Sequence, residues 1–244
     1  MSTQKKVMIV AGNRDYISMV RCVTNDIVPY SIDFEQAPEN YGLIMFTGGA
    51  DVDPSLYGDT SPNGLCGSGI SRDLVERRIF IKAVKCGIPM VGICRGIQFL
   101  NVMCGGKMMH HLDGHAGGVH FVKTLTDECI RVNSFHHQMI LPNKDAIVTE
   151  WSHTRLSFSY FGYGDKIVSY TGEEIEGAIF PKQKAFGVQY HPEMMLYEQP
   201  AVHRFVRMLR NVLEMPWENF VKKYSGGKYD GVAKESIVDS TITK

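Results

Sequence analysis

The amino-acid sequence predicts an α/β protein in which helices cover both faces of a mostly parallel central sheet. Short apolar runs without alternation recur in the first half of the chain, as in strands that are buried on both faces. Stretches with apolar residues at helical spacing follow several of these runs. Further along, shorter runs separated by turn residues indicate an antiparallel extension of the sheet.

The first strand and helix are predicted near the N-terminus. Residues 7–11 form an apolar run, which we interpret as a strand. The apolar residues after it recur at helical spacing and predict an amphipathic helix: Tyr16, Met19, Val20 and Val23.

A second strand, residues 43–46, leads into the adjacent glycines Gly48 and Gly49. Open α/β sheets place their binding sites at the carboxyl ends of strands, and glycines there let backbone amides approach a ligand closely. A plain turn is the alternative interpretation.

Residues 71–86 predict the clearest surface helix, because apolar residues share one face and basic residues occupy most of the other positions. Asp73 falls in its first turn, where the helix dipole favours a carboxylate. We interpret the neighbours Arg72 and Asp73 as a structural ion pair, and a role in substrate recognition is the less favoured alternative.

The segment Gly92–Gly96 carries the most informative pattern in the chain. It follows an apolar run, residues 88–93, and precedes a stretch with helical spacing, so Cys94 stands on a tight turn between a strand and a helix. A helix N-terminus favours thiolate, and the backbone N–H of Arg95 is left free to hold an oxyanion. The alternative is a buried, unreactive cysteine.

Partners for this cysteine are predicted far downstream. A further apolar run, residues 185–190, ends in His191, and Glu193 follows two positions later. A cysteine nucleophile needs a base, and the base needs a third group that fixes its orientation. The glycine pair after the second strand would then supply the second oxyanion donor.

The C-terminal half is predicted to finish a single domain. Three runs predict the antiparallel extension: residues 167–170, 177–180 and 185–190. Residues 202–213 predict a last helix, and the domain spans residues 1–223. Residues 224–244 are polar and rich in glycine, which predicts a loose tail.

Composition narrows the function classes. The 244 residues contain 26 Lys+Arg and 26 Asp+Glu, so net charge favours neither a nucleic acid nor an anionic membrane as partner. The six cysteines show no disulfide framework, residues 1–6 are polar, and no apolar run is long enough to span a membrane. We therefore expect a cytoplasmic protein. The residues do not define an oligomeric state, and a homodimer remains an open alternative.

Together these motifs resemble the class I glutamine amidotransferase-like family, and within it the γ-glutamyl hydrolase branch, peptidase C26. That branch includes hydrolases of γ-glutamyl-γ-aminobutyrate and of folate polyglutamates. The matching motifs lie in the family's order over roughly residues 7–213: 46–54, 56–58, Arg72-Asp73 with Glu76, 92–98, Asn101 with Gly105-Gly106, 132–138 and 187–193.

The resemblance implies a flavodoxin-like three-layer sandwich and a thiol-based mechanism without a cofactor. It implies that Cys94 is the nucleophile, His191 the base and Glu193 the acid that orients it. Backbone amides of Gly49 and Arg95 would form the oxyanion hole.

The resemblance also implies a set of substrate-binding residues around the glutamyl group: Gly48, Gln98, Ser134, Phe135 and His136. For His136 and the adjacent His137, a substrate contact and a structural hydrogen bond are equally weighted.

Two positions depart from the usual family pattern. Tyr190 stands where many members have tryptophan, and the residue at His137 varies. Neither is a catalytic group, so we expect these differences to reshape the rim of the substrate pocket.

Four histidines fall within eleven residues, which raises the question of a metal: His110, His111, His115 and His120. Their spacing fits no helical zinc pattern, and a metal beside the nucleophile would compete for its thiolate. The sequence therefore predicts no metal site.

The expected function is hydrolysis of a γ-glutamyl amide through a thioester on Cys94, releasing glutamate and an amine. One alternative is a glutaminase subunit that delivers ammonia to a separate synthetase. Another is a catalytically silent binding module, which the intact His191 and Glu193 argue against.

Overall fold

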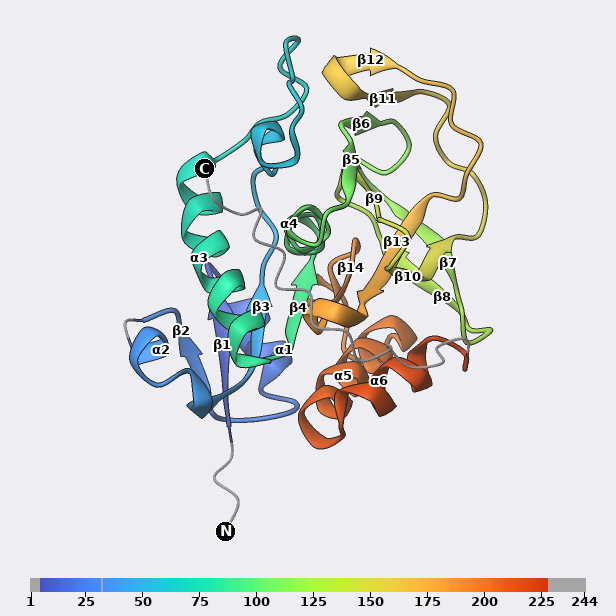
Figure 1. The fold of residues 1–244 in the computed structure, drawn as a ribbon. Coiled ribbons are helices and arrows are strands. Elements are labelled where there is room, and N and C mark those ends of the chain that lie inside the picture. Colours follow the sequence, from blue (N-terminus) through green and yellow to red (C-terminus); the bar gives the residue numbers. More distant parts are fainter. Residues whose placement is uncertain (1–4, 32, 228–244) are drawn as a thin grey trace.

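The computed structural model of the protein describes residues 5–31 and 33–227 (Figure 1). Within these residues a nine-stranded sheet runs through the molecule in the order β2-β1-β3-β4-β14-β13-β10-β7-β8. Its strands are β1 (Lys6–Val10), β2 (Ile27–Pro29), β3 (Tyr41–Phe46), β4 (Met90–Ile93), β7 (Val119–Thr124), β8 (Cys129–Asn133), β10 (Ile147–Ser152), β13 (Ile175–Phe180) and β14 (Ala185–Val188).

The strands β2, β1, β3, β4 and β14 are parallel, and their register determines where the site forms. Phe46 pairs with Gly92 across β3 and β4, and Ile93 pairs with Val188 across β4 and β14. The carboxyl ends of these three strands therefore lie side by side. Parallel strands buried on both faces account for the continuous apolar runs in the sequence.

The strands β13, β10, β7 and β8 continue the sheet in antiparallel fashion. The predicted α/β class is confirmed, but antiparallel pairings are as frequent as parallel ones within the described sheet. Two parts of the predicted extension differ. β14 pairs parallel with β4, and only its other edge, against β13, is antiparallel. Of residues 167–170, Ile167 alone is in a strand, outside the main sheet.

Five helices of more than one turn cover the described sheet, together with the single turn α2 (Asp33–Gln36). The predicted helices correspond to α1 (Arg14–Val20), α3 (Ile70–Cys86), α4 (Arg95–Met103) and α5 (Pro200–Glu214), while α6 (Trp217–Tyr224) was not predicted.

Apolar side chains form a separate layer on each face of the sheet. One layer contains residues of α1, α5 and α6, and the other contains residues of α2, α3 and α4. In Figure 1, α3 lies along one side of the sheet, and α4 is seen nearly end-on beyond the tip of β4. This arrangement is the three-layer sandwich that the sequence predicts.

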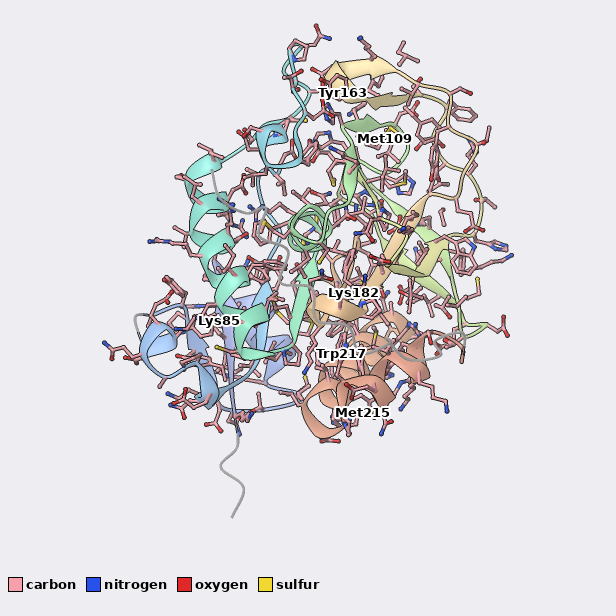
Figure 2. The ribbon with its side chains drawn as sticks, viewed as in Figure 1. Lys85, Met109, Tyr163, Lys182, Met215 and Trp217 are labelled. Atoms are coloured by element: carbon pink, nitrogen blue, oxygen red, sulfur yellow. The ribbon has the colours of Figure 1, made fainter. Side chains whose placement is uncertain are left out.

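Helix α6 closes the domain at its C-terminal end. Figure 2 shows Trp217 beside the turn after β13, near Lys182, and its indole N–H donates a hydrogen bond to the carbonyl of Pro181 at 3.0 Å. Tyr224, at the end of the helix, is 3 % exposed. The buried Tyr224 therefore belongs to the folded domain rather than to the predicted tail. The predicted tail residues from 228 onward lie outside the described residues.

Two small sheets stand beside the carboxyl ends of the central strands (Figure 1). One contains β6 (His111–Leu112), β11 (Tyr160–Gly162) and β12 (Lys166–Ile167), and the other pairs β5 (Lys107–Met109) with β9 (Met139–Leu141). None of the helices in the described part of the chain combines the length and apolar character needed to cross a bilayer.

Candidate active site

Cys94 stands between β4 and α4 in a strained backbone conformation. Its φ of 52° and ψ of −111° are unusual for a residue with a side chain, and such strain persists only where the surroundings enforce it. Gly96 helps to enforce it, because a Cβ there would collide with the carbonyl oxygen of Phe46. Helix α4 can therefore start close against β3, with the cysteine at its first turn.

His191 follows β14 and is oriented by two neighbours. Its Nδ1 lies 2.6 Å from Oε1 of Glu193, so the carboxylate holds the proton on that nitrogen. The side chain of Asn133 accepts a hydrogen bond from the backbone N–H of His191 at 2.8 Å and donates one to its carbonyl at 2.9 Å. The position of the imidazole is thus determined by both the side chain and the backbone.

The thiol of Cys94 and the carboxylate of Glu193 both influence the pKa of the His191 imidazole. Burial disfavours the imidazolium, but hydrogen bonds to Cys94 and Glu193 outweigh it and raise the pKa of His191 to about 10. Gly48 contacts both groups: a Cβ there would lie 2.8 Å from Cε1 of His191 and 3.7 Å from Cβ of Cys94. The ends of β3, β4 and β14 therefore converge on one point.

The loop after β3 presents backbone amides to this point. The N–H of Gly48 donates to the hydroxyl of Tyr16 at 3.0 Å, whereas the N–H of Gly49 has no hydrogen-bond partner among the described residues. Gly49 has a φ of +140°, which favours glycine. Burial and the nearby Glu193 raise the pKa of Tyr16, so its hydroxyl stays neutral.

Arg72, in helix α3, hydrogen-bonds to the backbone of this loop. Its Nη1 donates to the carbonyl of Gly48 at 2.8 Å, and its Nη2 donates to the carbonyl of Thr47 at 2.9 Å. Both carbonyls point toward the guanidinium, which turns the following N–H away from it. The planar fork of arginine suits this double contact.

Four charged side chains lie under the site as a connected cluster, which we call the charge cluster: Arg72, Asp73, Glu76 and Arg95. Glu76 accepts from Arg72 at 2.7 Å and also pairs with Arg95, which in turn pairs with Asp73. The last three side chains are at most 1 % exposed. The predicted pairing of Arg72 with Asp73 is therefore wrong, because a helix brings residues four apart together and adjacent ones apart.

A family model for peptidase C26 matches residues 27–193 of the chain. The chain belongs to the peptidase C26 family.

Curated relatives of this family member include a protein that is named as glutamine amidotransferase-like and a subunit of carbamoyl phosphate synthase. The chain is 28% identical over 206 residues to YvdE of Lactococcus lactis, named as glutamine amidotransferase-like, covering 74% of this chain and 79% of that one. It is 30% identical over 154 residues to the pyrimidine-specific small chain of carbamoyl phosphate synthase from Bacillus subtilis, covering 62% of this chain but only 38% of that one.

Solved structures share the fold of this peptidase C26 member. A protein from Thermoplasma acidophilum that is described as part of a GMP synthase superposes with a TM-score of 0.60 at 18% identity, over 87% of this chain and 96% of that one. A glutamine amidotransferase from Thermotoga maritima gives a TM-score of 0.55 at 16% identity, over 89% and 93%. These similarities show a class I glutamine amidotransferase fold of the flavodoxin-like kind.

The predicted substrate-binding residues differ in how closely they approach Cys94 and His191. Gly48 lies against both residues, and the ring centroids of Phe135 and His191 are 6.1 Å apart. Ser134 uses its hydroxyl to donate to the carbonyl of His115 at 2.8 Å. Gln98 is 2 % exposed and lies 3.4 Å from the carbonyl of Gln138. His136 is 4 % exposed and is held by the protein.

A cavity of about 270 Å³ opens beside Phe135, and Met194 and Leu196 also line it. Tyr190 does not reach this rim, because it is fully buried and donates its hydroxyl to Glu150 at 3.0 Å. The expectation that Tyr190 reshapes the pocket rim is therefore wrong. His137 lies 3.2 Å from the carboxylate of Asp51.

Three residues that position the site were not recognised as such from the sequence: Tyr16, Arg72 and Asn133. Tyr16 was assigned only to the apolar face of a helix, and its hydroxyl was the one available signal. Arg72 and Asn133 lie within family motifs. However, Arg72 in α3 contacts the loop after β3, and Asn133 at the end of β8 contacts His191 after β14, so both contacts join elements that are distant in sequence. No local spacing rule predicts such contacts.

Proposed function

We propose that the protein is a cysteine hydrolase that cleaves a γ-glutamyl amide and releases glutamate and an amine. The observation that carries the proposal is the convergence of Cys94, the His191–Glu193 pair and the free N–H of Gly49 at the ends of three adjacent strands. A nucleophile, an oriented base and an oxyanion donor are the parts that acyl transfer requires.

In the first half-reaction, the Cys94 thiolate attacks the δ-carbonyl carbon and forms a C–S bond. The backbone N–H groups of Gly49 and Arg95 stabilise the oxyanion. The intermediate collapses with cleavage of the C–N bond, and the His191 imidazolium gives its proton to the departing amine.

In the second half-reaction, water attacks the thioester. Once the sulfur is acylated its negative charge is gone, so one cause of the raised pKa of His191 disappears and the imidazole becomes a competent base. It removes a proton from water, and the tetrahedral intermediate expels the thiolate, which leaves glutamate. The substrate's α-amino and α-carboxylate groups would be bound near Gln98 and by the backbone around Ser134 and Phe135, with Gly48 and His136 bordering them.

A second candidate function is a glutaminase subunit that supplies ammonia to a separate synthetase. The similarity to the carbamoyl phosphate synthase small chain favours it. Glutamate release from glutamine and from a panel of γ-glutamyl amines distinguishes the two. Hydrolase function predicts higher kcat/KM for an amine conjugate than for glutamine, and a glutaminase subunit predicts the reverse with low activity alone. A reactive thiol also favours a reducing compartment, and we propose the cytoplasm.

Replacing Gly49 with alanine should lower kcat by roughly 10²–10³, the usual effect of losing one oxyanion donor. The added Cβ would collide with Nη1 of Arg72, and a φ of +140° disfavours any side chain, so the loop must move. Gly64→Ala is the matched control, because its φ of +69° is also left-handed but its Cβ would meet open space. Equal kcat in the two variants would contradict a role for the Gly49 amide.

Replacing Glu193 with glutamine should shift the alkaline limb of kcat/KM to lower pH. The carboxylate helps to raise the pKa of His191 to about 10, and its loss lets the imidazolium deprotonate earlier as pH rises. A neutral imidazole cannot protonate the amine, so acylation fails at a lower pH than in the wild type. The check is a pH profile with a γ-glutamyl anilide, with exposed Glu198→Gln as control. An unmoved limb would rule out this pairing.

A further inference from the structure

A second cluster of titratable side chains lies beside the catalytic residues, and the proposed mechanism does not use it. Its members are His115 in the loop before β7, His120 in β7, His136 after β8 and Glu176 in β13. They are 0 %, 8 %, 4 % and 0 % exposed, respectively. We call these four residues the histidine cluster. Buried polar groups of this kind need partners.

Three ring nitrogens converge on one carboxylate oxygen. Nδ1 of His115 and Nε2 of His120 each lie 3.2 Å from Oε1 of Glu176, and Nε2 of His136 lies 3.4 Å from it. Yet both nitrogens of His120, Nε2 of His136 and both carboxylate oxygens of Glu176 make no hydrogen bond to any described residue. The three rings thus lie within ion-pair distance of the carboxylate, but these nitrogens of His120 and His136 do not reach it in hydrogen-bond geometry.

The outer nitrogens of two rings indicate which atoms carry protons. Nε2 of His115 lies 3.1 Å from Oε2 of Glu174, and Nδ1 of His136 donates to the carbonyl of Gln138 at 2.9 Å. A carboxylate and a carbonyl only accept, so these outer nitrogens are the donors. In a neutral His136 the inner nitrogen therefore points a lone pair at the carboxylate of Glu176, whereas Nδ1 of His115 also lies 3.4 Å from the hydroxyl of Ser134. Lone pairs and a carboxylate repel unless a positive charge lies between them.

We propose that the histidine cluster binds a divalent transition-metal ion of the zinc class. Zinc bound at 2.0–2.1 Å in tetrahedral geometry places its ligand atoms about 3.3–3.4 Å apart, and the three nitrogen-to-oxygen distances of 3.2, 3.2 and 3.4 Å are close to that spacing. The ligand atoms of His115, His120 and Glu176 also lie within 4.8 Å of one another. His136 is not one of these three converging residues, but its Nε2 lies 3.4 Å from Oε1 of Glu176, and a shift toward the ion would make it the fourth ligand.

The surroundings of the cluster resemble those of zinc histidines in general. A ligating histidine almost always donates its other N–H to a carboxylate or a backbone carbonyl, which fixes its tautomer. Glu174 and the carbonyl of Gln138 occupy these positions for His115 and His136. The spacing argument that predicted no metal considered only histidines on one helix. Here the ligands come from a loop, two strands and the segment after a third.

The cluster lies between β7, β13 and the segment after β8, so a bound ion would link these three parts of the chain. His136 adjoins Phe135, whose ring faces His191, and the cluster ties this segment to β7 and β13. A bound ion would hold residues 134–136, which include the proposed substrate contacts Ser134 and Phe135, in place beside the imidazole of His191. It lies on separate residues from Cys94, so it does not compete for the thiolate.

The test is zinc content per chain after equilibrium dialysis of the purified full-length protein against buffered zinc. We expect one tightly held ion in the wild type and at least a tenfold lower affinity in Glu176→Gln and in His120→Asn. Cys66→Ser is the matched control, because Cys66, His110 and Asp165 form the other group of converging metal-ligand types in the described chain. Zinc retained in both cluster variants, or lost only in Cys66→Ser, would overturn the assignment.

A second measurement needs no variant. X-ray absorption on the zinc-loaded wild type should show nitrogen and oxygen neighbours with the multiple scattering of imidazole and no sulfur shell. A sulfur shell would place the ion at a cysteine and refute the proposal. A wild type that binds no zinc would show that protons, rather than a metal, neutralise the histidine cluster. None of these outcomes depends on hydrolytic activity, so they are independent of the proposed function.

Discussion

Replacing Cys94 with alanine should reduce glutamate release by a factor on the order of 10⁴–10⁶, as for loss of the nucleophile in other covalent hydrolases. The substitution removes one sulfur atom and leaves the strained backbone and helix α4 as they are. The folded state should therefore persist, which circular dichroism and the thermal midpoint would verify. The measurement is single-turnover release of glutamate from a γ-glutamyl amide.

Cys104→Ala is the control for this experiment. Cys104 ends the same helix and is equally buried, and burial raises the pKa of its thiol, so it stays protonated and unreactive. Its loss should leave kcat nearly unchanged. The wild type should also accumulate a glutamyl adduct on residue 94, visible by mass spectrometry after an acid quench. Turnover by Cys94→Ala comparable with that of Cys104→Ala would exclude the thioester mechanism.

Replacing Glu76 with glutamine should destabilise the fold by about 3–5 kcal/mol, the usual cost of removing one partner from a buried ion pair. Glu76 balances Arg72 and Arg95, so its neutralisation leaves Asp73 as the one carboxylate for two guanidinium groups in the charge cluster. Urea unfolding measures the loss.

The same variant should also lower kcat in the fraction that remains folded. Arg72 contacts the loop that carries Gly49, and Arg95 carries the other proposed oxyanion donor. Both arginines would lose their ion pair with Glu76, so both proposed donors would be positioned less firmly. Arg78→Gln on the exposed face of α3 removes a charge without breaking a buried pair, and should change stability by no more than about 0.5 kcal/mol. Similar stabilities for the two variants would show that the charge cluster does not hold the fold together.

Features that depend on local order along the chain could be predicted from the sequence. A strand, a tight turn with Cys94 and a helix follow one another directly, and His191 and Glu193 sit two residues apart, so local spacing alone indicates how each group relates to its neighbours. The α/β class followed from apolar runs and helical spacing for the same reason.

Elements that depend on distant pairing could not be predicted. Nothing near Tyr16 indicates that its hydroxyl meets Gly48, and adjacency in sequence suggested the wrong partner for Arg72. The histidine cluster joins residues 115–176, so its convergence emerges only from the pairing of β7, β10 and β13. Helix α6 is short, and its role becomes clear only from the contact of Trp217 with the turn after β13.

The place of β14 in the sheet has a consequence for how the protein is made. This strand inserts between β4 and β13, yet the ribosome synthesises it about 95 residues after β4. At typical rates of synthesis, about 5–20 residues per second, β14 is synthesised roughly 5–20 s after β4. During this time the edge of β4 that pairs with β14 has no partner strand. Until then an unpaired edge is open to association with other nascent chains, and the imidazole of His191, which follows β14, is not yet beside Cys94. The incomplete chain therefore exposes a strand edge and lacks the proposed catalytic pair, and the pairing of the single late strand β14 changes both conditions.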